Sequence, residues 1–292
     1  MVKVVRINLK TGTNNRQKLI DFCLNNTEQF VAIGWAGEYE TYEVYYQNVK
    51  KYMNRTNAAL NIFRTVEIGD LFWTRDLDGN YWICRAKSKA EAFYSEDLDI
   101  GAVIPVEAYK VGMQVPGQIK ASFNRANAGT ASQLRDPIIE EYSKAIYNNL
   151  SKSDHYNVNQ LEGSLLDNLP DFDLEELVIS YIQIKYDYYV LSNSIATKST
   201  TIKIECEFLS RNPEKMAKAV VQVKGKKAAP LDARQFMSFV NEGYQVFLFA
   251  PIIKNYEGLE NITIITPEEL LDFYQSHKKV LPSSITQWEK LY

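Results

Sequence analysis

Two neighbouring stretches of the sequence carry residues that can hold a metal ion beside a phosphate. Glu205 and Glu207 alternate with apolar residues, the period-2 pattern of a strand with one buried face, so both carboxylates share a face. Residues 219–223 are nearly all apolar, as in a strand buried on both sides, yet they include Gln222 and are followed by Lys224. Carboxylate and amide oxygens suit Mg²⁺, and a lysine can stabilise a scissile phosphate. The pattern is compatible with phosphodiester hydrolysis, and the alternative is that the two glutamates face solvent on an ordinary strand pair whose second strand has a polar end.

The order of acid, turn and Gln-x-Lys on a buried strand resembles the PD-(D/E)xK nuclease core, in the Mrr-like variant where glutamine replaces the second acid. The resemblance covers roughly residues 174–251. LEELV at 174–178 is similar to the opening helix of these nucleases, and 231–251 is similar to the helix and strand that follow the catalytic lysine. It implies a restriction-endonuclease-like αβ core with a central mixed sheet.

The resemblance also implies roles for individual residues. Glu207 or Glu205 and Gln222 would hold Mg²⁺, for which Mn²⁺ could substitute, Lys224 would be catalytic, and Glu175 would assist at the metal. The spacing to Gln222 favours Glu207. Both glutamates point the same way, and neither is the family's usual aspartate, so Glu205 stays an alternative.

Residues 68–86 predict the clearest hairpin of the first half, with two strands around the turn pair Asp78-Gly79. Trp73 and Trp82 fall in these strands. Large rings usually fill a core but also form binding surfaces, so both interpretations stay open.

Four segments together, AIGW at 32–35, GDLFWTRD at 69–76, GNYWICRA at 79–86 and GQIKASFNRANAGTASQLRD at 117–136, resemble the EVE/YTH-like branch of PUA-type folds. These small β-barrel domains read modified bases in nucleic acid. The resemblance covers roughly residues 1–150 and implies a pocket where a flipped-out base stacks on aromatic rings. The base-binding candidates are Trp35, Trp73, Trp82, Ser122, Asn124 and Arg125, the last three for the base edge or adjacent phosphates.

The length of 292 residues suits two domains of ordinary size. We expect a PUA-like domain at 1–150, a linker at 151–171 and a nuclease domain at 172–292, in an α+β or α/β fold class. Periodicity predicts strands at 2–9, 30–35, 188–191, 246–250 and 262–265. It predicts helices at 15–25, 42–63, 133–150, 173–188 and 233–241, and another that starts at Pro267. Asp173 is the expected cap of the helix at 173–188.

Charge and composition limit the class of protein. The net charge of −3 argues against a generally basic surface, so contact with nucleic acid must come from local patches, such as the lysines at 215, 218, 224, 226 and 227. Three separated cysteines and two histidines offer neither a zinc pattern nor a histidine-based site. With no leader and no long apolar run, we expect a cytoplasmic protein without membrane contact.

Together these features predict a modification-dependent DNA endonuclease that acts in defence against phage or foreign DNA. Its partner is double-stranded DNA carrying a modified base, and cutting both strands requires two active sites, hence a homodimer at least on DNA. Two alternatives remain open: a modified-nucleic-acid binding protein without catalysis, and a nuclease directed at RNA, since PUA-type domains also read RNA.

Overall fold

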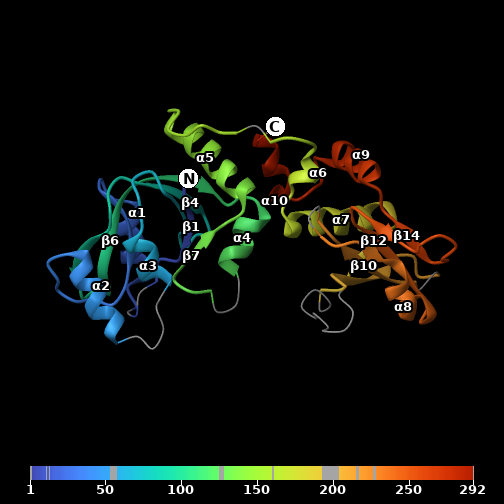
Figure 1. Ribbon diagram of the computed structural model, residues 1–292, viewed down its shortest axis with the longest axis horizontal. Helices are drawn as coiled ribbons and strands as arrows, with labels where there is room; N and C mark the ends of the chain where they lie inside the picture. The colour runs from blue at the N-terminus through green and yellow to red at the C-terminus, as the bar shows by residue number, and fades with distance from the viewer. Residues whose placement is uncertain are drawn as a thin grey trace. The chain divides into compact units, whose positions relative to one another are not determined.

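The computed structural model describes residues 2–10, 12, 14–52, 58–124, 128–159, 161–192, 204–214, 217–225 and 228–291. It shows a mixed α/β protein, in which helices pack against mixed sheets (Figure 1). The chain divides into two compact units. The first unit comprises residues 1–115, 119–161 and 290–292, and the second comprises 116–118 and 162–289.

A curled mixed sheet forms the centre of the first unit, with strand order β2-β6-β4-β3-β1-β7 and β5 paired to β6. The predicted hairpin is confirmed, because β3 and β4 pair antiparallel from Leu71↔Arg85 to Arg75↔Tyr81, and Gly79 in the turn has φ 85°. The strands are β1 (Val4–Ile7), β2 (Gln29–Ile33), β3 (Leu71–Arg75), β4 (Tyr81–Ala86), β5 (Glu91–Ser95), β6 (Ile100–Gly112) and β7 (Ala131–Leu134).

Helices cover both faces of this sheet. One face packs against α1 (Arg16–Leu24), α2 (Tyr42–Lys51) and α3 (Ala58–Arg64), whose apolar residues join a single core with Val5 and Phe72. The opposite face carries α5 (Pro137–Ser151), and α4 (Gly117–Asn124) precedes β7.

Two predicted helices of the first unit differ in the structure. The helix expected at 42–63 is two helices, and residues 53–57 between them lie outside the described residues. The helix expected from 133 begins at Pro137, because Asp136 caps it by accepting from the Ile138 amide, and proline suits the first turn. Gln133 and Leu134 instead belong to β7, which pairs with β1.

The second unit is built on a five-stranded sheet of order β14-β12-β10-β9-β8. Strands β8, β9 and β10 are antiparallel neighbours, whereas β10, β12 and β14 run parallel. The strands are β8 (Tyr188–Val190), β9 (Cys206–Ser210), β10 (Lys218–Val223), β12 (Tyr244–Phe249) and β14 (Ile262–Ile264), with β11 (Leu231–Asp232) and β13 (Ile253–Lys254) as a separate pair.

The helices of the second unit follow the predicted order. After the short α6 (Leu165–Asn168), α7 contacts β10, and α8 contacts β12 from the other side of the sheet (Figure 1). The helices are α7 (Asp171–Lys185), η1 (Ala233–Phe236), α8 (Met237–Asn241), α9 (Pro267–His277) and α10 (Ser283–Thr286), and η2 (Gln287–Leu291) follows.

The prediction that Asp173 caps the helix is wrong. Helix α7 begins earlier, at Asp171 after Pro170, and Asp173 is fully buried in its first turn. No helix in the described part of the chain has the length and apolarity needed to span a bilayer.

Candidate functional site

A hydrogen bond between side chains brings Glu205 to Gln222, because the Gln222 amide nitrogen donates to Glu205 Oε1 at 2.6 Å. The register of β9 and β10 pairs Cys206 with Val221 and Glu207 with Val220. The Glu205 amide donates to the Val221 carbonyl at 2.9 Å, one residue out of this register, so the ladder becomes irregular where β9 begins. Glu205 is therefore the carboxylate beside Gln222, whereas Glu207 lies opposite Val220.

Hydrogen bonds determine the orientation of the Gln222 amide. The side chain is 1% exposed, and its nitrogen donates to Glu205 Oε1 at 2.6 Å and to the Val223 carbonyl at 3.0 Å. Both partners are acceptors, so the flipped amide would place oxygen against oxygen. The amide oxygen consequently points away from these two groups.

Lys224 follows β10 directly and keeps it joined to β12. Its backbone amide donates to the Phe249 carbonyl at 2.8 Å, and its side chain is half-buried. By strand alternation the side chain shares the face of Gln222. At the next residue, a Cβ on Gly225 would lie 2.1 Å from Asp171 Oδ1, so a larger residue there would require the exposed Asp171 side chain to move.

Four carboxylates surround the beginning of β9. Burial first, and then the charges of Glu205, Glu176, Glu175 and Glu207, raise the pKa of the Cys206 thiol to about 12. Burial also raises the pKa of Glu176. Glu175 and Glu176 belong to α7, which contacts β10.

Glu205 and Gln222 suit Mg²⁺ better than a soft metal, because both can offer oxygen ligands. Within the described residues, no three His, Cys, Asp or Glu side chains form a metal-holding group. Mg²⁺ commonly keeps several waters and takes only one or two carboxylates. A site of one carboxylate and one amide oxygen fits that behaviour.

The lysine patch is only partly described. Lys218 lies over the Tyr244 ring, 5.6 Å from its centroid, at the opposite end of β10 from Lys224. Lys215, Lys226 and Lys227 lie outside the described residues.

Trp73, one of the base-binding candidates, belongs to the core of the first unit. It is 0% exposed, its indole nitrogen donates to Ser143 Oγ at 2.9 Å, and its ring stacks on Tyr142 with centroids 6.3 Å apart. The residue presents no ring face to a ligand and instead holds α5 on the sheet.

Trp35 and Trp82 are both half-buried and border the core on the face opposite to Trp73. The Trp82 indole nitrogen donates to Asp76 Oδ2 at 3.0 Å. Trp35 has φ 65°, a left-handed conformation that is strained for a bulky residue.

Hydrogen bonds on both sides hold Trp35 in this strained conformation. The Tyr45 hydroxyl donates to the Gly34 carbonyl at 2.6 Å, and the Asp99 carboxylate accepts from the Ala36 amide at 3.3 Å and the Gly12 amide at 2.9 Å. The surrounding structure thus stabilises one backbone geometry at Trp35.

The candidates on α4 lie apart from Trp82. Ser122 is buried and donates to the Ile119 carbonyl at 2.7 Å. Exposed Asn124 accepts from Arg75 Nη1 at 3.0 Å, and Arg75 alternates with Thr74, which pairs with Trp82. The five candidates that the structure describes therefore do not form one cluster, and Arg125 lies outside the described residues.

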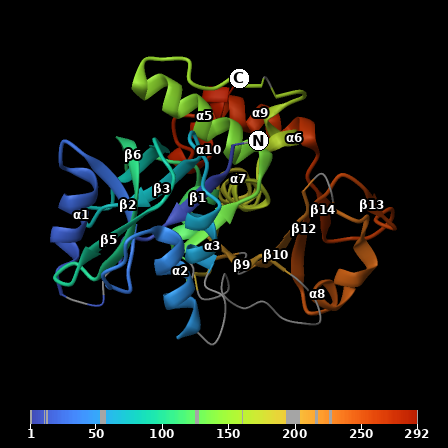
Figure 2. The same ribbon diagram turned by 60° about the vertical axis from the view of Figure 1, so that its left-hand side comes forward.

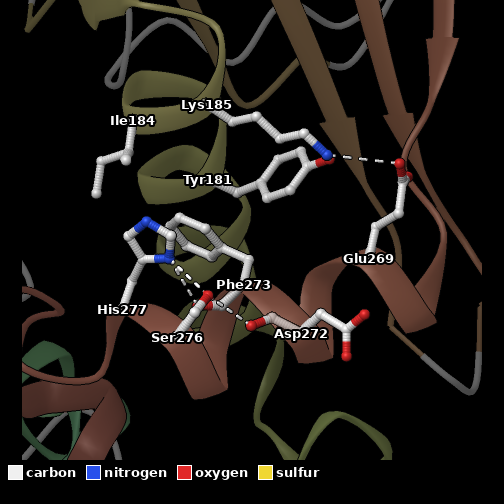
Figure 3. Close-up of a pocket in the computed structure, with 8 residues that line it drawn as sticks. All are labelled: Tyr181, Ile184, Lys185, Glu269, Asp272, Phe273, Ser276 and His277. Atoms are coloured by element: carbon white, nitrogen blue, oxygen red, sulfur yellow. Dashed lines mark hydrogen bonds and ion pairs between the residues drawn. The ribbon is translucent and has the colours of Figure 1, made fainter.

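A cavity of about 420 Å³ opens between α7 and α9 of the second unit (Figure 3). Lys185 Nζ donates to the Tyr181 hydroxyl at 2.9 Å and lies 3.6 Å from Glu269 Oε1, while the His277 ring stacks on Phe273 at 4.4 Å. No sequence pattern indicates this cavity, because its residues are ordinary for two packed amphipathic helices. None of the predicted metal or base ligands lines it.

Neither a protein-family model, nor a curated protein, nor a solved structure matches this chain.

Proposed function

We propose that this protein is a modification-dependent DNA endonuclease. The first unit reads a modified base, and the second unit hydrolyses phosphodiester bonds with Mg²⁺. The specific folds proposed are a PUA-like reader followed by an Mrr-like nuclease core.

One observation carries the nuclease proposal: the buried Gln222 amide donates to Glu205 Oε1 at 2.6 Å, and Lys224 lies two residues beyond Gln222 on the same face of the sheet. The chain order around these residues is α7, β8, β9, β10, the short strand β11, η1 with α8, and β12, so three antiparallel strands follow a helix, and a helical segment precedes the strand parallel to β10. This order agrees with the one that the resemblance implies, and supports the proposal by analogy of fold.

Glu205 and the Gln222 amide oxygen would hold the metal, with Glu207 as the next carboxylate along β9. When bound, Mg²⁺ would polarise a phosphate oxygen and acidify a water molecule. Lys224 contributes a positive charge that stabilises the negative charge developing on the phosphate. Glu175 and Glu176 add negative potential from α7, which favours retention of a cation near the start of β9.

The reader proposal now depends on Trp35 and Trp82 rather than on Trp73. Strained residues cluster at binding sites, and hydrogen bonds to the two residues that flank Trp35, Gly34 and Ala36, maintain its left-handed backbone. A flipped base would gain stacking energy on such half-buried rings, which offsets the cost of leaving the duplex.

The biological setting follows from this chemistry. Each chain offers one proposed nuclease site, so a homodimer or transient pairing on DNA would cut both strands. Cleavage of modified DNA in the cytoplasm would defend a cell against phage or other foreign DNA.

Digestion of matched plasmids tests the proposal. The substrates are unmodified or carry 5-methylcytosine, 5-hydroxymethylcytosine, glucosylated cytosine or N6-methyladenine, with Mg²⁺ or Mn²⁺ present. We expect cleavage of one modified plasmid only. Equal cutting of every plasmid would contradict the proposal that the first unit recognises a modified base, but would agree with the nuclease proposal. No cutting of any plasmid would contradict the nuclease proposal.

The hydrogen bond from Gln222 to Glu205 also favours a second candidate, a binding protein without catalysis, because it occupies one of the carboxylate oxygens that a metal would use. Mg²⁺-dependent nicking of any DNA excludes this candidate. Competition of the modified plasmid with a structured RNA of equal length separates DNA from RNA as the substrate.

A further inference from the structure

A polar pocket of about 510 Å³ lies in the second unit, beside β13 and the loop that follows it. Arg234 and Lys254 supply two exposed cations, and Tyr256 supplies a ring that is 43% exposed. The lining comprises Arg234, Ile253, Lys254, Asn255, Tyr256, Glu257 and Leu259. We call this the β13 pocket.

The β13 pocket lies on the sheet face that carries Gln222. Its residues Ile253 and Leu259 pack against the apolar cluster that contains Val220. Val220 and Gln222 share a face because they alternate with Val221 along β10.

The pocket also lies at the same end of the sheet as Lys224. Strands β10 and β12 run parallel and end at Val223 and Phe249, and the chain reaches β13 at Ile253 directly afterwards (Figure 2). The β13 pocket and the proposed nuclease site therefore share one face and one end of the sheet.

The polar groups of the pocket are held in place before any ligand binds. Asp232 Oδ1 accepts from the Arg234 amide at 3.0 Å. The pKa of Asp232 is lowered mainly by a hydrogen bond from the Asn255 side chain and next by the one from the Arg234 backbone amide. The Asp232 carboxylate therefore stays ionised and acts as an acceptor. Asn255 itself has φ 56°, a conformation that asparagine tolerates well.

The charge of the pocket limits its ligand. Two cations attract a phosphate, but Glu257 in the lining and Asp232 beside it oppose the accumulation of several negative charges. A phosphodiester carries one negative charge, unlike a nucleoside triphosphate. The exposed Tyr256 ring offers a face on which a base can stack, and the Asn255 amide offers a donor and an acceptor.

We propose that the β13 pocket binds one nucleotide unit of a DNA strand, with its backbone phosphate between Arg234 and Lys254 and its base on Tyr256. This inference rests on the proposed function and extends it, because it assigns a strand-binding position beside the nuclease site. The pocket would orient the strand relative to Glu205 and Lys224.

The first experiment measures binding of the full chain to a fluorescein-labelled DNA duplex and to the matching single strand, in EDTA so that no cleavage occurs. The test variant is Arg234→Ala with Lys254→Ala. Its control is Arg211→Ala with Lys279→Ala, which removes the same charge from exposed positions of the second unit. We expect the test variant to bind DNA about tenfold more weakly than the wild type. The slope of the logarithm of the binding constant against the logarithm of the salt concentration should become shallower by about 1, while the control keeps the wild-type affinity and slope.

A second measurement separates a binding role from a structural one. Tyr256→Ala should weaken single-strand binding by about tenfold, and Tyr256→Phe should retain it, because stacking needs the ring and not the hydroxyl. In hydrogen exchange, residues 252–260 should gain protection when DNA binds, whereas α9 should not change.

The outcomes distinguish the two proposals. If the wild-type protein cleaves no plasmid but the test variant binds DNA more weakly than the wild type, the nuclease proposal is contradicted and the proposed role of the β13 pocket is supported. If the wild-type protein cleaves DNA and the test variant keeps the wild-type affinity and salt slope, the proposed role of the β13 pocket is contradicted. Absence of DNA binding by the wild type, or preference for RNA of the same sequence, also overturns it.

Discussion

The Gln222 amide nitrogen donates to the Glu205 carboxylate over 2.6 Å, across the two neighbouring strands β9 and β10. Gln222 is 1% exposed, and a buried amide without partners costs about 1–3 kcal/mol. The hydrogen bond removes that cost and brings a carboxylate to the one polar side chain of an otherwise apolar strand segment. This pair is the geometric basis for each prediction about the nuclease site.

Lys224→Ala should reduce DNA cleavage by about 100-fold or more, because it removes the charge that stabilises the phosphate. Binding to modified DNA should change little. The matched control is Lys218→Ala, at the other end of β10, which should cleave as the wild type does. Unchanged cleavage by the Lys224 variant in a plasmid assay would contradict the proposed role.

Glu205→Gln should impair cleavage more than Glu207→Gln, because Glu205 accepts a hydrogen bond from Gln222 whereas Glu207 lies opposite Val220. Both substitutions remove one charge from the same strand, so each controls for the other. Mn²⁺ titration followed by electron paramagnetic resonance should show weaker metal binding in the Glu205 variant. Stronger impairment by Glu207→Gln would assign the metal to Glu207.

Trp73 and Trp35 should behave differently when changed. Trp73→Phe loses packing and the hydrogen bond to buried Ser143, so the free energy of unfolding should fall by about 1–3 kcal/mol, with the preference among modified plasmids unchanged. Trp35→Phe should lower the affinity for modified DNA with a smaller loss of stability. Urea unfolding and anisotropy measure the two effects, and the reverse pattern would exclude Trp35 from the reader.

Asp173 should make the stability of the second unit depend on pH. Burial, with a smaller contribution from the charge of Glu176, raises the pKa of Asp173 from 3.8 to about 7, although hydrogen bonds from Trp288 Nε1 and the Gln118 amide lower it. As the pH rises from about 4 to 7, the unfolded chain releases a proton that the folded chain keeps, so this contribution to stability is lost.

Asp173→Asn removes this titration and keeps an oxygen acceptor for Trp288. The stability of the variant relative to the wild type should therefore rise with pH across that window and level off above it. Urea unfolding of both proteins at several pH values provides the measurement. Parallel stability curves would show that Asp173 does not titrate as its burial implies.

Local sequence patterns predicted most of the elements in the second unit. Alternation located the β9 and β10 hairpin, and the long apolar stripe located α7, because burial imposes period 2 on strands and period 3.6 on helices. The β3 and β4 hairpin was equally readable, since Asp78-Gly79 suits its tight turn. The long strand β6 and the short helix α4 were not predicted.

Residue type and spacing are local properties, so the amino-acid sequence was enough to identify the side chains that could do chemistry. Which of these side chains meet depended on the folded arrangement. The folded chain brought Glu205 rather than Glu207 to Gln222, at the point where the β9–β10 ladder leaves its regular register. Packing of α5 buried Trp73, whereas Trp82 in the same hairpin stays half-buried. Register and packing depend on contacts between residues distant in the chain, and a local pattern contains no record of them.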